Sequence, residues 1–370
     1  MILGIDVSSF LEEQRIINPK YKENGKVIDP FLLFKNQGIS HVRIRIWNDP
    51  YSENHEPYLG GTCDLDNCLN LIKQLEKYGF SYLIDFHYSD FWVDPSKQSM
   101  PKAWVNLKEE ELLKEVYTFT KDCLTKIKEV TDRVTHIQIG NETTHGMLFP
   151  YAKLEGEGDR KESFAKLSNV LRHGIKAANE VFPEAKTIIH LEQSYDQKLY
   201  LEYFEELIKN NVKFDIIGST YYPFWHHSFL EYFANMDLMR NHFHKEVMNM
   251  ETAFPFTLKD YQDDGDHINH LVINENNASE MQKVVPYEIS KKGQQEYVHD
   301  FLKSADEHQL SGVFYWEPLW IPGKGICWAS IEGQKYQNDI KNSTRNEWAN
   351  QCLFDYQGEM LPAFKEFKKN

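Results

Sequence analysis

The chain has 370 residues, with 41 Lys and Arg against 56 Asp and Glu, which gives a formal net charge of −15. This acidic surplus disfavours nucleic acid and anionic membranes as partners, because both attract basic surfaces. Five cysteines form no CxxC pair, which favours reduced and mostly buried thiols. The first residues, MILGIDVSSF, resemble a strand rather than a leader, so we expect a cytoplasmic protein, or a secreted one if a signal was removed.

Short β-branched or apolar runs alternate along the chain with longer segments of helical periodicity. Such alternation predicts parallel βα units, and eight units predict a closed (β/α)8 barrel. No linker or composition break divides the sequence, so we expect one catalytic barrel domain over residues 1–370. The predicted strands are Ile2–Val7, His41–Trp47, Ser81–His87, Val134–Gly140, Thr187–Leu191, Phe214–Ser219, Glu246–Glu251 and Gly312–Trp316.

The segments between these strands carry helix signals. Asp29-Pro30 provides an N-cap followed by proline at the first helical position. Apolar residues then recur at i, i+3, i+4 and i+7 in three longer segments, at 65–75, 112–127 and 164–178. Long irregular segments follow the strands at 48–64, 89–108, 145–160, 252–290 and 317–347. Barrels of this kind keep their chemistry on that face.

Polar and aromatic side chains gather where the predicted strands end. Arg43 and Arg45 alternate along the second strand and should face the same way. Glu142 and Glu251 end the fourth and seventh strands, which face each other across the barrel axis, so their carboxyl groups should converge. The other residues at this mouth are Asp6, His87, Asn141, Tyr221, Tyr222 and Trp316.

Two carboxyl groups across a cleft, with aromatic and arginine side chains nearby, suit cleavage of a glycosidic bond. One carboxyl protonates the leaving oxygen, and the other attacks the anomeric carbon or activates water. A retaining enzyme separates the two groups by ~5–5.5 Å and an inverting enzyme by ~6.5–9.5 Å. Structural roles stay open as alternatives: ion pairing inside the barrel for Arg43 and Arg45, a core position for His87, and packing for Trp316.

Other catalytic chemistries have no matching motif. The sequence contains no GxSxG elbow, P-loop, GxGxxG or HExxH. His226, His227, His242, His244 and His299 lack the convergence that a catalytic metal requires. We therefore expect catalysis without a cofactor.

Several long motifs occur in order from residue 4 to residue 364 and together resemble the endo-β-1,4-galactanase family. That family belongs to the clan of retaining (β/α)8 glycoside hydrolases. The resemblance implies action on β-1,4-galactan, as in pectin side chains, or on galacto-oligosaccharides. We also expect a monomer. The motifs are HVRIRIWNDP, LIDFHYSDFWVDPSKQSMPKAW, IQIGNETTHGM, YYPFW, METAFPFT, GVFYWEPLWIP and NEWANQCLFDYQGEMLP.

The resemblance also implies a role for individual residues. Glu142 would be the acid/base and Glu251 the nucleophile, with Asn141 as the partner of the sugar 2-hydroxyl. Arg45 and Tyr221 would hold the nucleophile, with Arg45 in hydrogen-bond reach of Glu251. The residues expected to line the sugar-binding subsites are Asp6, His87, Asp90, Trp92, Trp316 and, as an outer platform, Trp320.

The chain departs from the family pattern in places. ETAFPFT stands where ETAYPYT is commoner, and His145 and Phe149 stand where Asn and Trp are frequent. Bacterial relatives hold a structural Ca²⁺ in a loop after strand seven. Here DDGDHINH is one residue short, which favours a solvated acidic turn over a calcium site at Asp264, Asp266 and Asn269. An exo-β-galactosidase, a β-1,4-mannanase or a non-catalytic sugar-binding barrel remain the alternative functions.

Overall fold

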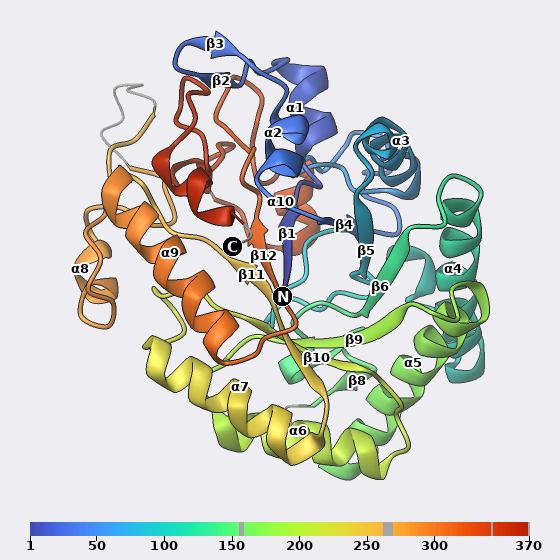
Figure 1. The fold of residues 1–370 in the computed structure, drawn as a ribbon. Coiled ribbons are helices and arrows are strands. Elements are labelled where there is room, and N and C mark those ends of the chain that lie inside the picture. Colours follow the sequence, from blue (N-terminus) through green and yellow to red (C-terminus); the bar gives the residue numbers. More distant parts are fainter. Residues whose placement is uncertain (155–158, 262–268, 342, 369–370) are drawn as a thin grey trace.

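A computed structural model describes residues 1–154, 159–261, 269–341 and 343–368. Eight of the strands in these ranges form one closed parallel barrel in the order β1-β12-β11-β10-β9-β6-β5-β4 (Figure 1). The predicted closed barrel is confirmed, and each of its strands overlaps a predicted one. They are β1 (Ile2–Asp6), β4 (His41–Ile46), β5 (Ser81–Phe86), β6 (Val134–Ile139), β9 (Lys186–Leu191), β10 (Ile216–Thr220), β11 (Glu246–Thr252) and β12 (Gly312–Trp316).

Helices surround the barrel (Figure 1). The predicted N-cap is confirmed: the Asp29 side chain accepts from the backbone N–H groups of Phe31 and Leu32, at the start of α2. The helices are α1 (Phe10–Ile16), α2 (Pro30–Asn36), α3 (Leu65–Leu75), α4 (Glu109–Lys128), α5 (Arg160–Val181), α6 (Gln197–Lys209), α7 (Phe229–Phe243), α8 (Ala278–Met281), α9 (Lys291–Glu307) and α10 (Ile331–Gln337).

Small elements complete the loops. Two hairpins pair β2 (Lys22–Glu23) with β3 (Lys26–Val27) and β7 (Gly146–Met147) with β8 (Ala152–Lys153). The 3-10 helices are η1 (Glu76–Tyr78), η2 (Lys102–Trp104), η3 (Thr143–His145), η4 (Ala349–Gln351) and η5 (Pro362–Phe367). Within the described ranges, no helix is both long and apolar enough to cross a membrane.

Apolar side chains fill one part of the barrel interior and charged ones another. The apolar cluster consists of Leu83, Ile188, Ile216, Met248, Met250 and Phe314. Continuing along β4 and β5, the inward positions become Arg43 and Asp85, which are fully buried and form an ion pair at 2.8 Å. A larger apolar core packs the helices onto the outside of the barrel. The polar end of the interior is therefore the end that leads to the functional face.

Two departures from regular strand geometry place the paired glutamates. The pairing of β11 shifts between Asn249 and Thr252. Met250 packs in the interior cluster and its neighbour Glu251 also reaches the mouth, whereas a regular strand would turn successive side chains to opposite faces. After β6, Gly140 has φ +83° and Glu142 has φ +49°, both left-handed. A Cβ on Gly140 would lie 2.7 Å from the Thr143 methyl group, so glycine is required there.

Candidate active site

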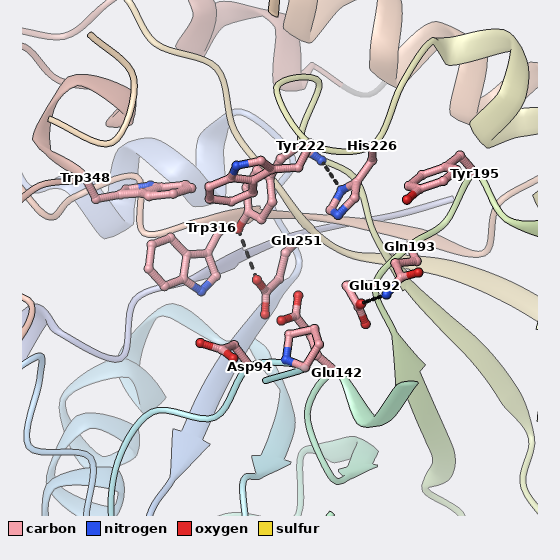
Figure 2. Close-up of a pocket in the computed structure, with 12 residues that line it drawn as sticks. Asp94, Glu142, Glu192, Gln193, Tyr195, Tyr222, His226, Glu251, Trp316 and Trp348 are labelled. Carbon is pink, nitrogen blue, oxygen red and sulfur yellow. Dashed lines mark hydrogen bonds between the residues drawn. The ribbon is translucent and has the colours of Figure 1, made fainter. Parts of the chain in front are cut away.

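A cavity of about 530 Å³ opens at the carboxyl ends of the strands, and both glutamates line it. In Figure 2 the side chains of Glu142 and Glu251 point toward one another at its centre. Aromatic rings form one wall beside Glu251, and polar side chains lie beyond Glu142. The lining residues are Asp94, Pro95, Glu142, Glu192, Gln193, Tyr195, Tyr222, Trp225, His226, Glu251, Trp316 and Trp348.

Glu251 is buried and is held by one cation and one phenol. Arg43 Nη1 donates to its Oε1 at 2.8 Å, and the Tyr222 hydroxyl donates to its Oε2 at 3.0 Å. His226 in turn fixes Tyr222, because its Nδ1 accepts from the Tyr222 backbone N–H at 2.9 Å. Burial raises the pKa of Glu251, and the positive charge of Arg43 opposes that rise.

The expectation that Arg45 and Tyr221 hold Glu251 is wrong. Arg45 donates to Asp6 at 3.1 Å and to Glu317 at 2.7 Å, while its guanidinium lies under the Trp92 ring. Arg43 and Arg45 do face the same way, but they lie at different depths, and only Arg43 reaches Glu251. The Tyr221 hydroxyl donates to the His227 carbonyl at 2.8 Å, outside the barrel interior.

The carboxyl group of Glu142 has fewer hydrogen-bond donors than that of Glu251 among the described residues. Its Oε1 accepts from the Thr220 hydroxyl at 2.9 Å. Burial, followed by the negative charges of Glu251 and Glu192, raises the pKa of Glu142 well above its ordinary value. Because no arginine offsets this rise, Glu142 holds its proton to higher pH than Glu251 does. The pair therefore supplies one protonated and one ionised carboxyl over an intermediate pH range.

A chain of hydrogen bonds connects the two carboxyl groups through the barrel interior. His190 Nε2 donates to Thr220 Oγ1 at 2.8 Å, and His190 Nδ1 accepts from Gln138 Nε2 at 3.1 Å. Gln138 Oε1 accepts from Arg43 Nε at 3.2 Å, and Arg43 Nη1 reaches Glu251. Burial and the nearby Arg43 charge lower the pKa of His190 well below its ordinary value, so this imidazole is neutral. The chain fixes the relative positions of both carboxyl groups.

The remaining predicted residues are placed close to the cavity in different ways. Trp316 lines it, and its ring lies 5.9 Å from that of Trp92. Asp6 is fully buried and pairs with Arg43 and Arg45, which makes it part of the support beneath the cavity. Trp320 is only 1% exposed, so the expectation that it forms an outer platform is wrong.

His87 and Asp90 are also buried. His87 Nε2 lies 3.0 Å from Asp85, and its Nδ1 accepts from the Trp47 indole N–H at 3.1 Å. Asp90 accepts from the backbone N–H groups of Asp49 and Lys102, and burial raises its pKa to about 6. Neither residue lines the cavity. Their hydrogen bonds instead hold neighbouring side chains and loops in place.

Sequence reasoning missed several lining residues. Glu192 ends β9 on the inward side, two positions after His190, so the period-two alternation of that strand would have found it. Trp348 lies in the motif NEWANQCLFDYQGEMLP but does not follow a barrel strand, so its place at the mouth could not be read from strand ends. The residues that sequence reasoning did not single out for the cavity are Asp94, Pro95, Glu192, Gln193, Tyr195, Trp225, His226 and Trp348.

The calcium expectation falls largely outside the described residues, since Asp264 and Asp266 belong to 262–268. Asn269 is described, and its side-chain oxygen accepts from the backbone N–H of Leu271 at 3.2 Å while its amide donates to the Leu258 carbonyl. That side chain therefore bridges two points of its own loop. No group of three or more His, Cys, Asp or Glu within the described part of the chain is placed to hold a metal.

A (β/α)8 barrel with two convergent glutamates at the carboxyl ends of its fourth and seventh strands defines a glycoside hydrolase. A model of one family, glycosyl hydrolase family 53, matches residues 2–367. The chain belongs to that family.

Its relatives agree with this assignment. An endo-beta-1,4-galactanase of Bacillus subtilis (strain 168) is 34% identical over 387 residues, covering 99% of this chain and 85% of the relative. An arabinogalactan endo-beta-1,4-galactanase of Cellvibrio japonicus (strain Ueda107) is 28% identical and covers 99% and 90%. The solved GH53 catalytic domain of Ignisphaera aggregans is 33% identical, with a TM-score of 0.87 over 99% of this chain and 95% of that one.

Proposed function

We propose that this glycoside hydrolase cleaves β-1,4-galactosidic bonds within galactan chains or galacto-oligosaccharides derived from them, with Glu251 as nucleophile and Glu142 as acid/base. The observation that carries the proposal is the unequal setting of the pair: Arg43 and Tyr222 donate to Glu251, whereas Glu142 receives only the Thr220 hydroxyl among the described residues. The galactan specificity of the named relatives supports the choice of substrate.

In the first step, an ionised oxygen of Glu251 attacks the anomeric carbon of the galactose unit beside it. The bond from that carbon to the bridging oxygen breaks, and Glu142 gives its proton to this oxygen. The fragment on the reducing-end side leaves with a free 4-hydroxyl group, and the fragment on the non-reducing side is esterified to Glu251 through its anomeric carbon. Asn141 supports this step by donating to the 2-hydroxyl, since an amide carries two N–H donors and one of them contacts Val93 at 3.3 Å.

In the second step, Glu142 acts as the base. Esterification removes the negative charge of Glu251, and this lowers the pKa of Glu142, which is now ionised. Glu142 takes a proton from an incoming water molecule, whose oxygen attacks the anomeric carbon and releases Glu251. The product keeps the β configuration, because two inversions have occurred at one carbon.

The assay is reducing-sugar release from lupin or potato galactan, followed by sizing of the products. We expect a ladder of short galacto-oligosaccharides early in the reaction and no activity for Glu142→Ala. Galactose as the sole early product would favour an exo-β-galactosidase, and activity on β-1,4-mannan alone would favour a mannanase. Binding of galactan without any release would identify a sugar-binding barrel.

We also propose that the enzyme works as a monomer in the cytoplasm on imported galacto-oligosaccharides. All five cysteines are buried and free, which suits a reducing compartment. Detection of the native protein in cell and medium fractions, with its mass in solution by light scattering, tests both points. Intact protein in the medium, or a dimer mass, would contradict the respective part.

A further inference from the structure

A third carboxyl group lines the cavity and has no part in the two-step reaction above. Glu192 follows β9 and is 6% exposed. Thr144 Oγ1 donates to its Oε2, and Gln193 Nε2 donates to its Oε1 at 2.9 Å. Both donors are neutral, and no cation in the described part of the chain forms an ion pair with it. A buried carboxyl of this kind is costly unless a ligand supplies further donors.

Glu192 lies on the leaving-group side of the reaction. In Figure 2 Glu142 lies between Glu251 and Glu192, and Trp316 and Trp348 lie on the opposite side of Glu251. The acid must reach the bridging oxygen, and the nucleophile attacks from the other side of the anomeric carbon. The leaving galactose unit therefore lies beyond Glu142, where the wall consists of Glu192, Gln193 and Tyr195.

The β-1,4 linkage determines which hydroxyl groups of the leaving galactose unit lie near Glu192. The leaving unit contributes its O4 to the scissile bond, so the hydroxyl groups nearest to that bond are those at C3 and C6. Burial raises the pKa of Glu192 to about 7, and above that pH its ionised carboxyl group can accept several hydrogen bonds beside those from its two protein donors. The ring of Tyr195 stacks on His227 at 3.9 Å with an interplanar angle of 4°, and this held ring extends the same wall.

We propose that Glu192 binds the galactose unit on the leaving-group side through its 3- or 6-hydroxyl, and so selects sugar over other leaving groups. The inference rests on the proposed galactan hydrolysis and adds a specificity-determining residue to it. Each of the three carboxyl groups then has its own role. Glu251 bonds to the anomeric carbon, Glu142 transfers the proton, and Glu192 binds the leaving sugar.

The test compares β-1,4-galactotetraose with phenyl β-1,4-galactobioside, which needs a proton on its leaving oxygen but offers no hydroxyl to Glu192. Glu192→Gln removes the charge, and Glu192→Asp keeps the charge but shortens the reach. Both variants should lose about 10- to 100-fold in kcat/KM on galactotetraose, as expected for weakened hydrogen bonds to a charged group. On the phenyl substrate, measured on the plateau of the pH–activity profile, both should stay within about threefold of the unaltered enzyme, a change of under 1 kcal/mol. Loss of the Glu192 charge in Glu192→Gln lowers the pKa of Glu142 and so shifts only the alkaline limb.

The matched control is Glu246→Gln, since Glu246 pairs with Lys186 at the other end of the barrel and should change neither rate. Equal losses on both substrates would overturn the inference, because they would indicate a structural or purely electrostatic role. Unchanged rates on galactotetraose would overturn it as well. An unaltered enzyme that cleaves neither substrate would instead contradict the proposed function, so the two failures are distinguishable.

Discussion

Arg43 joins Glu251 to Asp85 inside the barrel, with an Nη–O distance of 2.8 Å to each carboxylate. The arginine is fully buried, and its second partner, Asp85, also lies 3.0 Å from His87. Because the guanidinium has a rigid, planar fork, it can hold both carboxylates at once. Arg43 thus orients the proposed nucleophile Glu251 from inside the barrel, without contacting the substrate itself.

Arg43→Lys should therefore lower kcat/KM on galactan by about 100- to 1000-fold, because one ammonium group cannot hold three carboxylates in the geometry of the fork. The matched variant is Arg45→Lys, whose partners are Asp6 and Glu317. We expect Arg45→Lys to lower the Tm with a smaller change in kcat. Steady-state kinetics and thermal melts check both, and equal effects on kcat would contradict the separate roles.

The different depths of Arg43 and Arg45 in the barrel could not be predicted from the sequence. Alternation along β4 predicted that both point inward, which is right, but it carries no information on depth. Tyr221 and Tyr222 show a different failure. Inward positions on β10 continue from Ile216 through Thr220 to Tyr222, so alternation could have chosen Tyr222.

The fold itself followed from local signals. β-branched and apolar runs predicted each barrel strand, and the Asp29 cap and the apolar spacing predicted helices between them. These signals suffice for the fold because a (β/α)8 barrel repeats one simple unit. Glu251 is different. Glu251 reaches the mouth because the strand pairing of β11 shifts beside it. With strict alternation it would point out of the barrel, since its neighbour Met250 points inward. Its place at the mouth was predicted from the end of the seventh strand and from the family resemblance, but it does not follow from the alternation of side chains along that strand.

Thr220→Val should shift the alkaline limb of the pH–activity profile upward. The Thr220 hydroxyl bond lowers the pKa of Glu142, and its loss leaves burial and the charges of Glu251 and Glu192, which raise it. Glu142 then keeps its proton to higher pH, so the acid form persists further. Thr220→Ser retains the hydroxyl and should leave the limb in place. A downward shift for Thr220→Val would contradict this account.

Glu13 on α1 should make folding stability depend on pH. Burial, with the charges of Glu317 and Glu12, raises the pKa of Glu13 well above its ordinary value of 4.5. The stability from this bound proton is fully present below pH 4.5, and it is lost as the pH rises through the raised pKa.

Glu13→Gln removes this dependence, because an amide has no proton to give up. We expect its Tm, relative to the unaltered enzyme, to be higher at pH 8 than at pH 5. The control is Glu110→Gln on the exposed face of α4, which should show no such difference. A larger relative Tm at pH 5 would show that the carboxyl is ionised in the folded state.

Removal of metal ions should leave the enzyme unchanged if the loop around Asn269 is a solvated turn. Treatment with EDTA, followed by addition of Ca²⁺, is measured by thermal melting and by activity on galactan. We expect the same Tm in each state, because the Asn269 oxygen already accepts from Leu271. A lower Tm with EDTA that Ca²⁺ restores would identify a structural calcium site in this loop.

The roles of the two glutamates are tested most directly by azide rescue. Replacing either side chain with alanine opens space for a small anion beside the anomeric carbon, on opposite faces of the sugar. With an aryl β-galactobioside and azide, the configuration of the azide product is read by proton NMR. We expect an α-glycosyl azide from Glu251→Ala and a β-glycosyl azide from Glu142→Ala. The reverse assignment, a β product from Glu251→Ala, would contradict the proposed roles.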